Sequence, residues 1–242
     1  MRHLSRLRPK SFLDAPRREW QFNAFAWLLR GCGGYPKFLD TMLVLPIEAH
    51  FPDRGMNGHA AAAALFRRVR DHAGMADWPC LVEPAPSEPA QSPVPERLRV
   101  IHYAASERAP EALVAHFAHE LARYLVESLE EPPPGGAPLY EPAVDFAAVF
   151  MGFGVFMANA AARSAHLNLN EGELVHALAM FCVLRKLPAE AVDPHLNAHV
   201  RKYLRLALRD LAQFDRDFQR LRSLFAVVPT DGGECTLPTR AG

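Results

Sequence analysis

Five ionisable side chains fall on one line of a predicted helix near the middle of the chain. Residues 116–127 read HFAHELARYLVE, and at about 100° per residue one narrow stripe holds His116, His119, Glu120, Arg123 and Glu127. Imidazole and carboxylate groups placed in this way can bind a metal ion or transfer protons. For this helix alone, a solvated polar face explains the pattern equally well, since short motifs often occur by chance.

A pair of acidic residues follows this helix. Glu141 and Asp145 lie one helical turn apart, in the sequence EPAVD, directly before the apolar run FAAVFMGFGVFMANAAA at 146–162. Carboxylates at the edge of a buried helix are costly unless they face a cation or hydrogen-bond donors. We therefore expect a positive group opposite them, and predict that Arg123 lies within ion-pair distance of Glu141 or Asp145.

Together, the two motifs resemble the gluzincin branch of the HExxH metallopeptidases, in which ExxxD follows HExxH after some twenty residues. Most of the chain is also similar to a group of uncharacterised bacterial proteins, in which an HELGH or HELAH helix precedes EPxxD and a run like VFMGFGVFMANAA. The resemblance implies a zincin-like core, zinc and peptidase chemistry. It assigns His119 as first metal ligand, Glu120 as general base, Glu141 as a further ligand and Asp145 as the carboxylate behind the site.

The chain departs from this pattern at one position, because HELAR places Arg123 where the family has its second histidine. Catalytic zinc needs three protein ligands and one open position, and a guanidinium has no lone pair to donate. High-affinity zinc is therefore not expected. The guanidinium would instead bind Glu141 or Asp145 and supply the positive charge that the metal supplies in the family.

Two further histidines leave an alternative open. His116 lies one turn before His119, so an ion displaced toward the start of the helix could be held by His116, His119 and Glu141. Glu120 would then activate water, and Arg123 would stabilise the developing oxyanion. A hydrogen-bonded histidine without a metal is the simpler interpretation of His116. His176 can likewise be a hydrogen-bond donor near the site or a core histidine.

The elements that must position these residues give an α+β fold. We predict a helix that begins at Asp14 and Pro16 and ends near Gly31, helices at 60–72, 111–129, 142–164, 171–187 and 194–224, the last with an optional break, and strands at 38–47, 78–82 and 98–103. One domain would span 1–228, with a mixed part at 1–109, a proline-rich loop at 83–96, a helical part at 110–228 and a flexible tail at 229–242. Gly152 and Gly154 are expected to let the His119 helix approach closely. The loop 130–138 can be a lid or a simple chain reversal.

Composition sets limits on location and partners. Half of the 242 residues are apolar and basic and acidic residues number 27 each, so one core is expected and neither nucleic acid nor an anionic membrane is indicated as a partner. The apolar run lacks an aromatic belt and basic anchors, which favours a core helix over a membrane span. Scattered cysteines without a CxxC pair, and a basic start without an apolar stretch after it, favour the cytoplasm.

Three functional hypotheses follow. The first is a degenerate zinc-metallopeptidase-like protein, catalytically impaired or inactive, that binds a peptide or protein partner. The second is an active metal-dependent hydrolase that uses His116, His119 and Glu141. The third is a helix whose ion pairs are purely structural.

Overall fold

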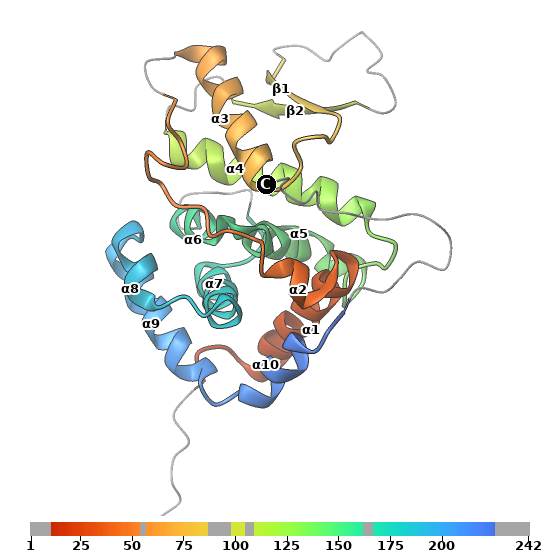
Figure 1. Ribbon diagram of the computed structural model, residues 1–242, viewed down its shortest axis with the longest axis vertical. Helices are drawn as coiled ribbons and strands as arrows, with labels where there is room; N and C mark the ends of the chain where they lie inside the picture. Colours follow the sequence, from red (N-terminus) through yellow and green to blue (C-terminus); the bar gives the residue numbers. More distant parts are fainter. Residues whose placement is uncertain (1–10, 54–56, 87–97, 105–108, 162–166, 226–242) are drawn as a thin grey trace, which may run out of the picture.

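A computed structural model describes residues 11–53, 57–86, 98–104, 109–161 and 167–225. It is mostly helical with one small parallel sheet, which agrees with the predicted α+β class at that level (Figure 1). The helices and strands are α1 (Ala15–Gly31), α2 (Gly34–Phe38), α3 (Gly58–His72), β1 (Cys80–Pro84), β2 (Arg99–Tyr103), α4 (Pro110–Ser128), α5 (Tyr140–Ala148), α6 (Gly154–Ala160), α7 (Glu171–Arg185), α8 (Ala189–Val192), α9 (Ala198–Leu211) and α10 (Asp215–Arg222). There are also three short helical turns among the described residues: η1 (Ala137–Leu139), the π-turn η2 (Val149–Phe153) and η3 (Asp193–His195).

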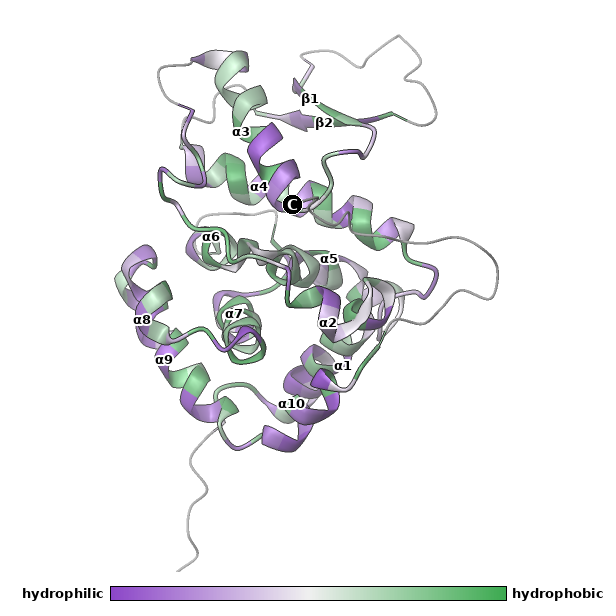
Figure 2. Cartoon of the chain, in the orientation of Figure 1, coloured by the Kyte–Doolittle hydropathy of each residue, from purple (hydrophilic) through white to green (hydrophobic). Residues whose placement is uncertain are grey.

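Helix α4 lies between two layers of the molecule. On one side it contacts α3 and β2, and on the other it packs on α5 and α6, which in turn contact α7 (Figure 1). Figure 2 shows that α5, α6 and α7 are mostly hydrophobic, whereas α10 at the periphery is mostly hydrophilic. The helix with the candidate motif therefore packs against other elements on both of its long faces.

Local signals in the sequence account for several helix boundaries. The Asp14 side chain accepts a hydrogen bond from the backbone N–H of Arg17, and Pro16 occupies the first turn of α1. Asn170 and Glu173 form a reciprocal capping box at the start of α7. The predicted helices at 60–72, 111–129 and 171–187 are confirmed with small shifts, and the predicted helix at 194–224 is broken into α9 and α10.

The two predicted strands at 78–82 and 98–103 are present as β1 and β2. They pair in parallel, with Cys80 opposite Arg99 and Pro84 opposite Tyr103. Strand β1 continues two residues into the predicted proline-rich loop, whose residues 87–96 lie outside the described residues, as does the predicted tail at 229–242.

The predicted strand at 38–47 is wrong. Its first residue ends α2, and residues 41–45 have no strand partner. The backbone N–H of Val44 instead donates to the carbonyl of Gly152, at 2.9 Å. Gly152 has a φ of +98°, and a Cβ there would lie 2.1 Å from the Met42 carbonyl oxygen. A backbone does approach Gly152 closely, as predicted, but it is this extended segment and not α4, while Gly154 lies against the side chain of Leu178.

The apolar run forms the centre of the core. The continuous helical stretch from 137 to 160 is long and apolar enough to cross a membrane, yet 94% of its most apolar window is buried inside the fold. The prediction of a core helix is therefore confirmed for the described residues, while the predicted helix end at 164 lies outside them. The loop before this stretch is tied to α1, because the indole N–H groups of Trp20 and Trp27 donate to the carbonyls of Pro134 and Glu131.

Candidate functional site

The site begins with a buried contact between α4 and α5. Nδ1 of His119 lies 2.9 Å from Oδ1 of Asp145, whose side chain is fully buried. The other Asp145 oxygen accepts backbone N–H groups from Leu169, at 2.8 Å, and from Asn168, just before α7. Asp145 therefore joins three parts of the fold and fixes the orientation of the His119 ring.

Arg123 completes the arrangement one helical turn after His119. Its Nη1 and Nη2 donate to the two carboxylate oxygens of Glu141, at 2.7 Å and 2.6 Å, and Nη2 is also 3.2 Å from Nε2 of His119. The predicted ion pair between Arg123 and Glu141 is thus confirmed. Because a guanidinium only donates, Nε2 of His119 accepts, and the imidazole proton lies on Nδ1 and is donated to Asp145.

The charges in this chain of contacts stabilise each other. The hydrogen bonds from Arg123 hold the pKa of Glu141 below its usual value, and the same bonds raise the pKa of Arg123 further above its own. Burial raises the pKa of the neighbouring Tyr140 hydroxyl. Asp145, His119, Arg123 and Glu141 therefore form one continuous network that runs from the core to the surface.

These residues do not fit a zinc ion in the arrangement that the resemblance implies. The two groups that would bind the metal, Nε2 of His119 and the Glu141 carboxylate, both accept hydrogen bonds from Arg123. Among the residues that the structure describes, no three His, Cys, Asp or Glu side chains are grouped so that they could hold a metal ion.

The alternative ligand set is not assembled. His116 faces β2, and its Nε2 lies 2.8 Å from the carbonyl oxygen of His102. In the part of the chain that the structure describes, β2 has a strand partner on one side only, so an outward carbonyl is available to a side-chain donor from α4. His116 and His119 share the helix but bind different neighbours, so the described contacts do not bring His116, His119 and Glu141 together.

Glu120 and Glu127 have separate surroundings. Oε1 of Glu120 is 4.0 Å from Nε2 of His119, and about a quarter of its side chain is exposed, at 26%. Glu127 forms an ion pair with Arg99 of β2. The predicted polar stripe therefore divides into a network around Arg123 and a second pair that ties α4 to the sheet.

His176 is a core histidine and not a neighbour of the site. It is fully buried on α7, with Nδ1 2.7 Å from Oε1 of Gln21 on α1 and its ring stacked on Phe12. Burial lowers the pKa of His176 to about 4, so the imidazole is neutral near pH 7. Of the two alternatives for His176, the contacts agree with the core histidine, because α7 presents this residue to α1.

The sequence prediction missed the backbone N–H groups of Asn168 and Leu169, which bind Asp145. Main-chain donors leave no residue-type signal, although a buried aspartate implies that donors exist. Comparisons of the chain with protein-family models, curated proteins and solved structures found no match. A function therefore has to be inferred from the contacts around Arg123.

Proposed function

We propose that this chain is a catalytically inactive, zincin-like protein that binds a peptide or protein partner in the cytoplasm. One observation carries the proposal: the guanidinium of Arg123 lies between Nε2 of His119 and the carboxylate of Glu141. In the resembling metallopeptidases, a metal ion would lie between these two groups.

The remaining contacts support the substitution of a guanidinium for a metal. Metal-binding histidines commonly donate their second ring N–H to a carboxylate, which fixes the tautomer that keeps a lone pair for the metal. His119 makes this contact with Asp145 and offers its lone pair to Arg123. The supports expected around a metal ligand are therefore present, while the cation is covalently part of the chain.

Hydrolysis by the usual route would require a metal ion that polarises the carbonyl and lowers the pKa of its bound water. Arg123 supplies positive charge but cannot bind water as a Lewis acid does. Glu120 lies beside the network, but among the described residues the ion whose water it would deprotonate has no complete set of ligands. The geometry thus favours binding over peptide hydrolysis.

A binding role is supported by the partial exposure of the same residues. The exposed fractions are 24% for the Arg123 side chain and 43% for Glu141. Tyr124, the residue after Arg123 in α4, packs edge to face with Trp78, and Arg99 lies over the Tyr124 ring. Aromatic residues and arginine are enriched in protein interfaces. The rings can pack on apolar side chains of a polypeptide, and the charged groups can form hydrogen bonds with its backbone amides.

The test is to restore the missing ligand with Arg123→His and to use Arg123→Gln as the matched control. Protein purified without chelators is analysed for zinc, and thermal unfolding is followed with and without added zinc. We expect little zinc in the wild type, and zinc-dependent stabilisation of Arg123→His alone, because an ion that binds only the native state stabilises it. Equal responses of Arg123→His and Arg123→Gln would overturn the substituted-metal interpretation.

Activity provides the second measurement. We expect no chelator-sensitive cleavage of unstructured casein by the wild type, and no change with Glu120→Gln. Cleavage that Glu120→Gln abolishes would instead identify a working hydrolase.

A further inference from the structure

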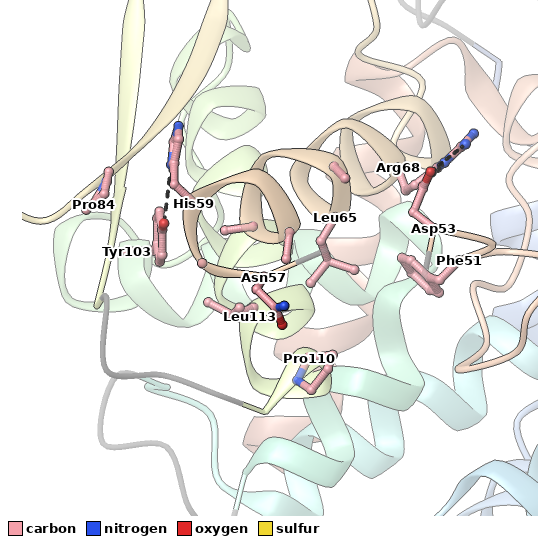
Figure 3. A pocket seen from close by; sticks show the side chains of 14 residues that line it. Phe51, Asp53, Asn57, His59, Leu65, Arg68, Pro84, Tyr103, Pro110 and Leu113 are labelled. Carbon is pink, nitrogen blue, oxygen red and sulfur yellow. Dashed lines mark hydrogen bonds and ion pairs between the residues drawn. The ribbon is translucent and has the colours of Figure 1, made fainter. Parts of the chain in front are cut away.

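A second feature of the molecule lies near the other end of α4. A cavity of about 420 Å³ opens between α3, the first turns of α4 and the ends of both strands (Figure 3). This volume lies within the range of small-molecule sites in proteins. Its apolar walls are formed by Phe51, Ala61, Ala62, Ala64, Leu65, Pro84, Tyr103, Pro110 and Leu113.

Small residues on α3 leave this space open. Ala61 and Ala64 are three residues apart, so they lie on one face of the helix, and both line the cavity. Leu113 and Pro110 of α4 line it from another element, as does Tyr103 of β2. A larger side chain at Ala61 would occupy the space that a ligand needs.

The charged residues of the cavity neutralise each other. Nε of Arg68 lies 2.7 Å from Oδ2 of Asp53, and Figure 3 shows the pair together at one end of the cavity. The hydrogen bond from Arg68 lowers the pKa of Asp53 and raises that of Arg68, so both remain charged near pH 7. Among the described lining residues, Asp53 and Arg68 are already paired with each other, so a charged ligand would lose hydration without gaining a free counter-ion from them, a cost that an uncharged ligand would not incur.

Neutral polar groups remain for hydrogen bonding. Asn57 precedes α3, but its side chain does not cap the helix and makes no hydrogen bond within the described part of the chain. The rings of His59 and Tyr103 stack at a centroid distance of 6.2 Å, with Nδ1 of His59 3.3 Å from the Tyr103 hydroxyl. An amide such as that of Asn57 can both donate to and accept from a ligand.

We propose that this cavity binds an uncharged small molecule with an aromatic or branched aliphatic body and one amide or hydroxyl group. The body packs against Leu65, Leu113 and Tyr103, and the polar group forms hydrogen bonds with Asn57. The site is separate from the Arg123 network, because Leu113 and Arg123 are ten residues apart on α4, which is about 15 Å of helix. It goes beyond the proposed function and does not depend on it.

Three probes of one shape and different charge test the ligand class. The uncharged 4-phenylbutanamide, the anion 4-phenylbutyrate and the cation 4-phenylbutylamine are titrated into the full chain by isothermal calorimetry. We expect the amide to bind at least tenfold more tightly than either charged probe. Absence of amide binding, or equal or tighter binding of a charged probe, overturns the proposal.

Two adjacent substitutions locate the binding. Ala61→Phe fills the cavity, whereas Ala60→Phe places the same ring on the exposed neighbouring residue, which does not line it. We expect Ala61→Phe to weaken amide binding at least tenfold and Ala60→Phe to leave it unchanged. Retained binding in Ala61→Phe, or equal loss in both, overturns the assignment.

A third variant keeps the proposal testable if Ala61→Phe does not fold, as judged by circular dichroism. Asn57→Leu removes the amide while preserving most of the side-chain volume. We expect it to weaken 4-phenylbutanamide binding about fivefold or more and to leave the binding of butylbenzene, which has no polar group, unchanged. Unchanged affinity for the amide overturns the proposed role of Asn57 and with it the site.

Discussion

Arg123 is the cation that joins His119 of α4 to Glu141 of α5. A neutral imidazole at the place where His119 and Glu141 converge would have only one N–H donor for these two acceptors. The longer arginine side chain brings its own cation to that place and binds both groups through parallel N–H donors. These bonds and the contact between His119 and Asp145 join the four side chains in one network.

The first prediction concerns Glu141. We expect Glu141→Gln to lower the free energy of unfolding by about 1–2 kcal/mol near pH 7, because a charge-assisted bidentate bond is replaced by a weaker one. The pKa of Glu141 is lowered in the folded state, so its contribution is present above the unfolded pKa of about 4.3 and is lost as pH falls through the folded pKa. Urea titrations should therefore show the difference from wild type shrinking as the pH falls below the unfolded pKa of about 4.3.

A more exposed pair supplies the control for this experiment. Glu131 lies 3.4 Å from Arg30, and 58% of its side chain is exposed. Glu131→Gln should change the free energy of unfolding by less than about 0.5 kcal/mol at every pH. If the two variants behave alike, the Arg123 network contributes no more than an ordinary surface pair.

The second prediction concerns His176. Its pKa is about 4 in the folded state, against about 6.5 when unfolded, so the unfolded chain binds more protons between these values. Stability should be full above about pH 6.5 and should fall by up to about 3 kcal/mol by about pH 4 from this group alone. His176→Phe should reduce this part of the pH dependence of unfolding, whatever its effect at pH 7. An unchanged slope between these pH values would show that the folded histidine titrates normally.

The Arg123–Glu141 pair and two histidines, His116 and His176, show what residue types can and cannot predict. The pairing of Arg123 with Glu141 followed from a physical requirement, because acidic residues at the start of an apolar helix need a positive neighbour. His116 and His176 had no such requirement, and helical periodicity gives the direction of a side chain without the identity of what it faces. The carbonyl of His102 and the amide of Gln21 come from distant parts of the chain.

The π-turn η2 depends on the extended segment beside it, and Gly152 is the residue where they meet. We expect Gly152→Ala to lower the free energy of unfolding by about 3 kcal/mol or more, because its φ of +98° is strained for alanine and its Cβ would overlap the Met42 carbonyl oxygen. Chemical denaturation measures the change in the free energy of unfolding.

Gly172→Ala is the control. Gly172 lies in the first turn of α7 and has no positive φ, and a Cβ there would lie within 4 Å of Asn170 Oδ1 only, at 3.3 Å. Its effect should stay below about 1 kcal/mol.

The same contact explains why the strand at 38–47 was predicted wrongly. Residues of this segment have the β-branched and apolar character of a strand, and residues 41–45 lack regular secondary structure. The backbone N–H of Val44 donates to the carbonyl of Gly152 at a helix distortion, whereas the prediction assumed a neighbouring strand. Residue preference predicts extended backbone, but the partner of that backbone is a tertiary property.

Across the fold, the sequence predicted which elements exist better than it predicted their neighbours. Apolar periodicity and capping residues identify the helices, and the mixture of elements gives the α+β class. The position of α4 between the sheet layer and the apolar helices was not predicted. Its polar stripe is compatible both with solvent and with contacts to another element, so the sequence does not show that this side is packed. The cavity was also missed, since it lies between alanines on α3 and residues of α4 and of both strands, which come from distant parts of the chain.

The last prediction follows from this division into layers. Amide hydrogen exchange should be slowest in α5, α6 and α7, where nearly every side chain is buried, and faster in β1 and β2. A two-stranded sheet is only marginally stable alone, and this one depends on α3 and α4 for its packing. Its amides should therefore exchange through local opening at a free energy below that of global unfolding, whereas the central helices should report the global value. Mass spectrometry of amide exchange in low urea measures the free energies of local opening and of global unfolding. Equal protection of the strands and the central helices would mean that the two layers unfold as one cooperative unit.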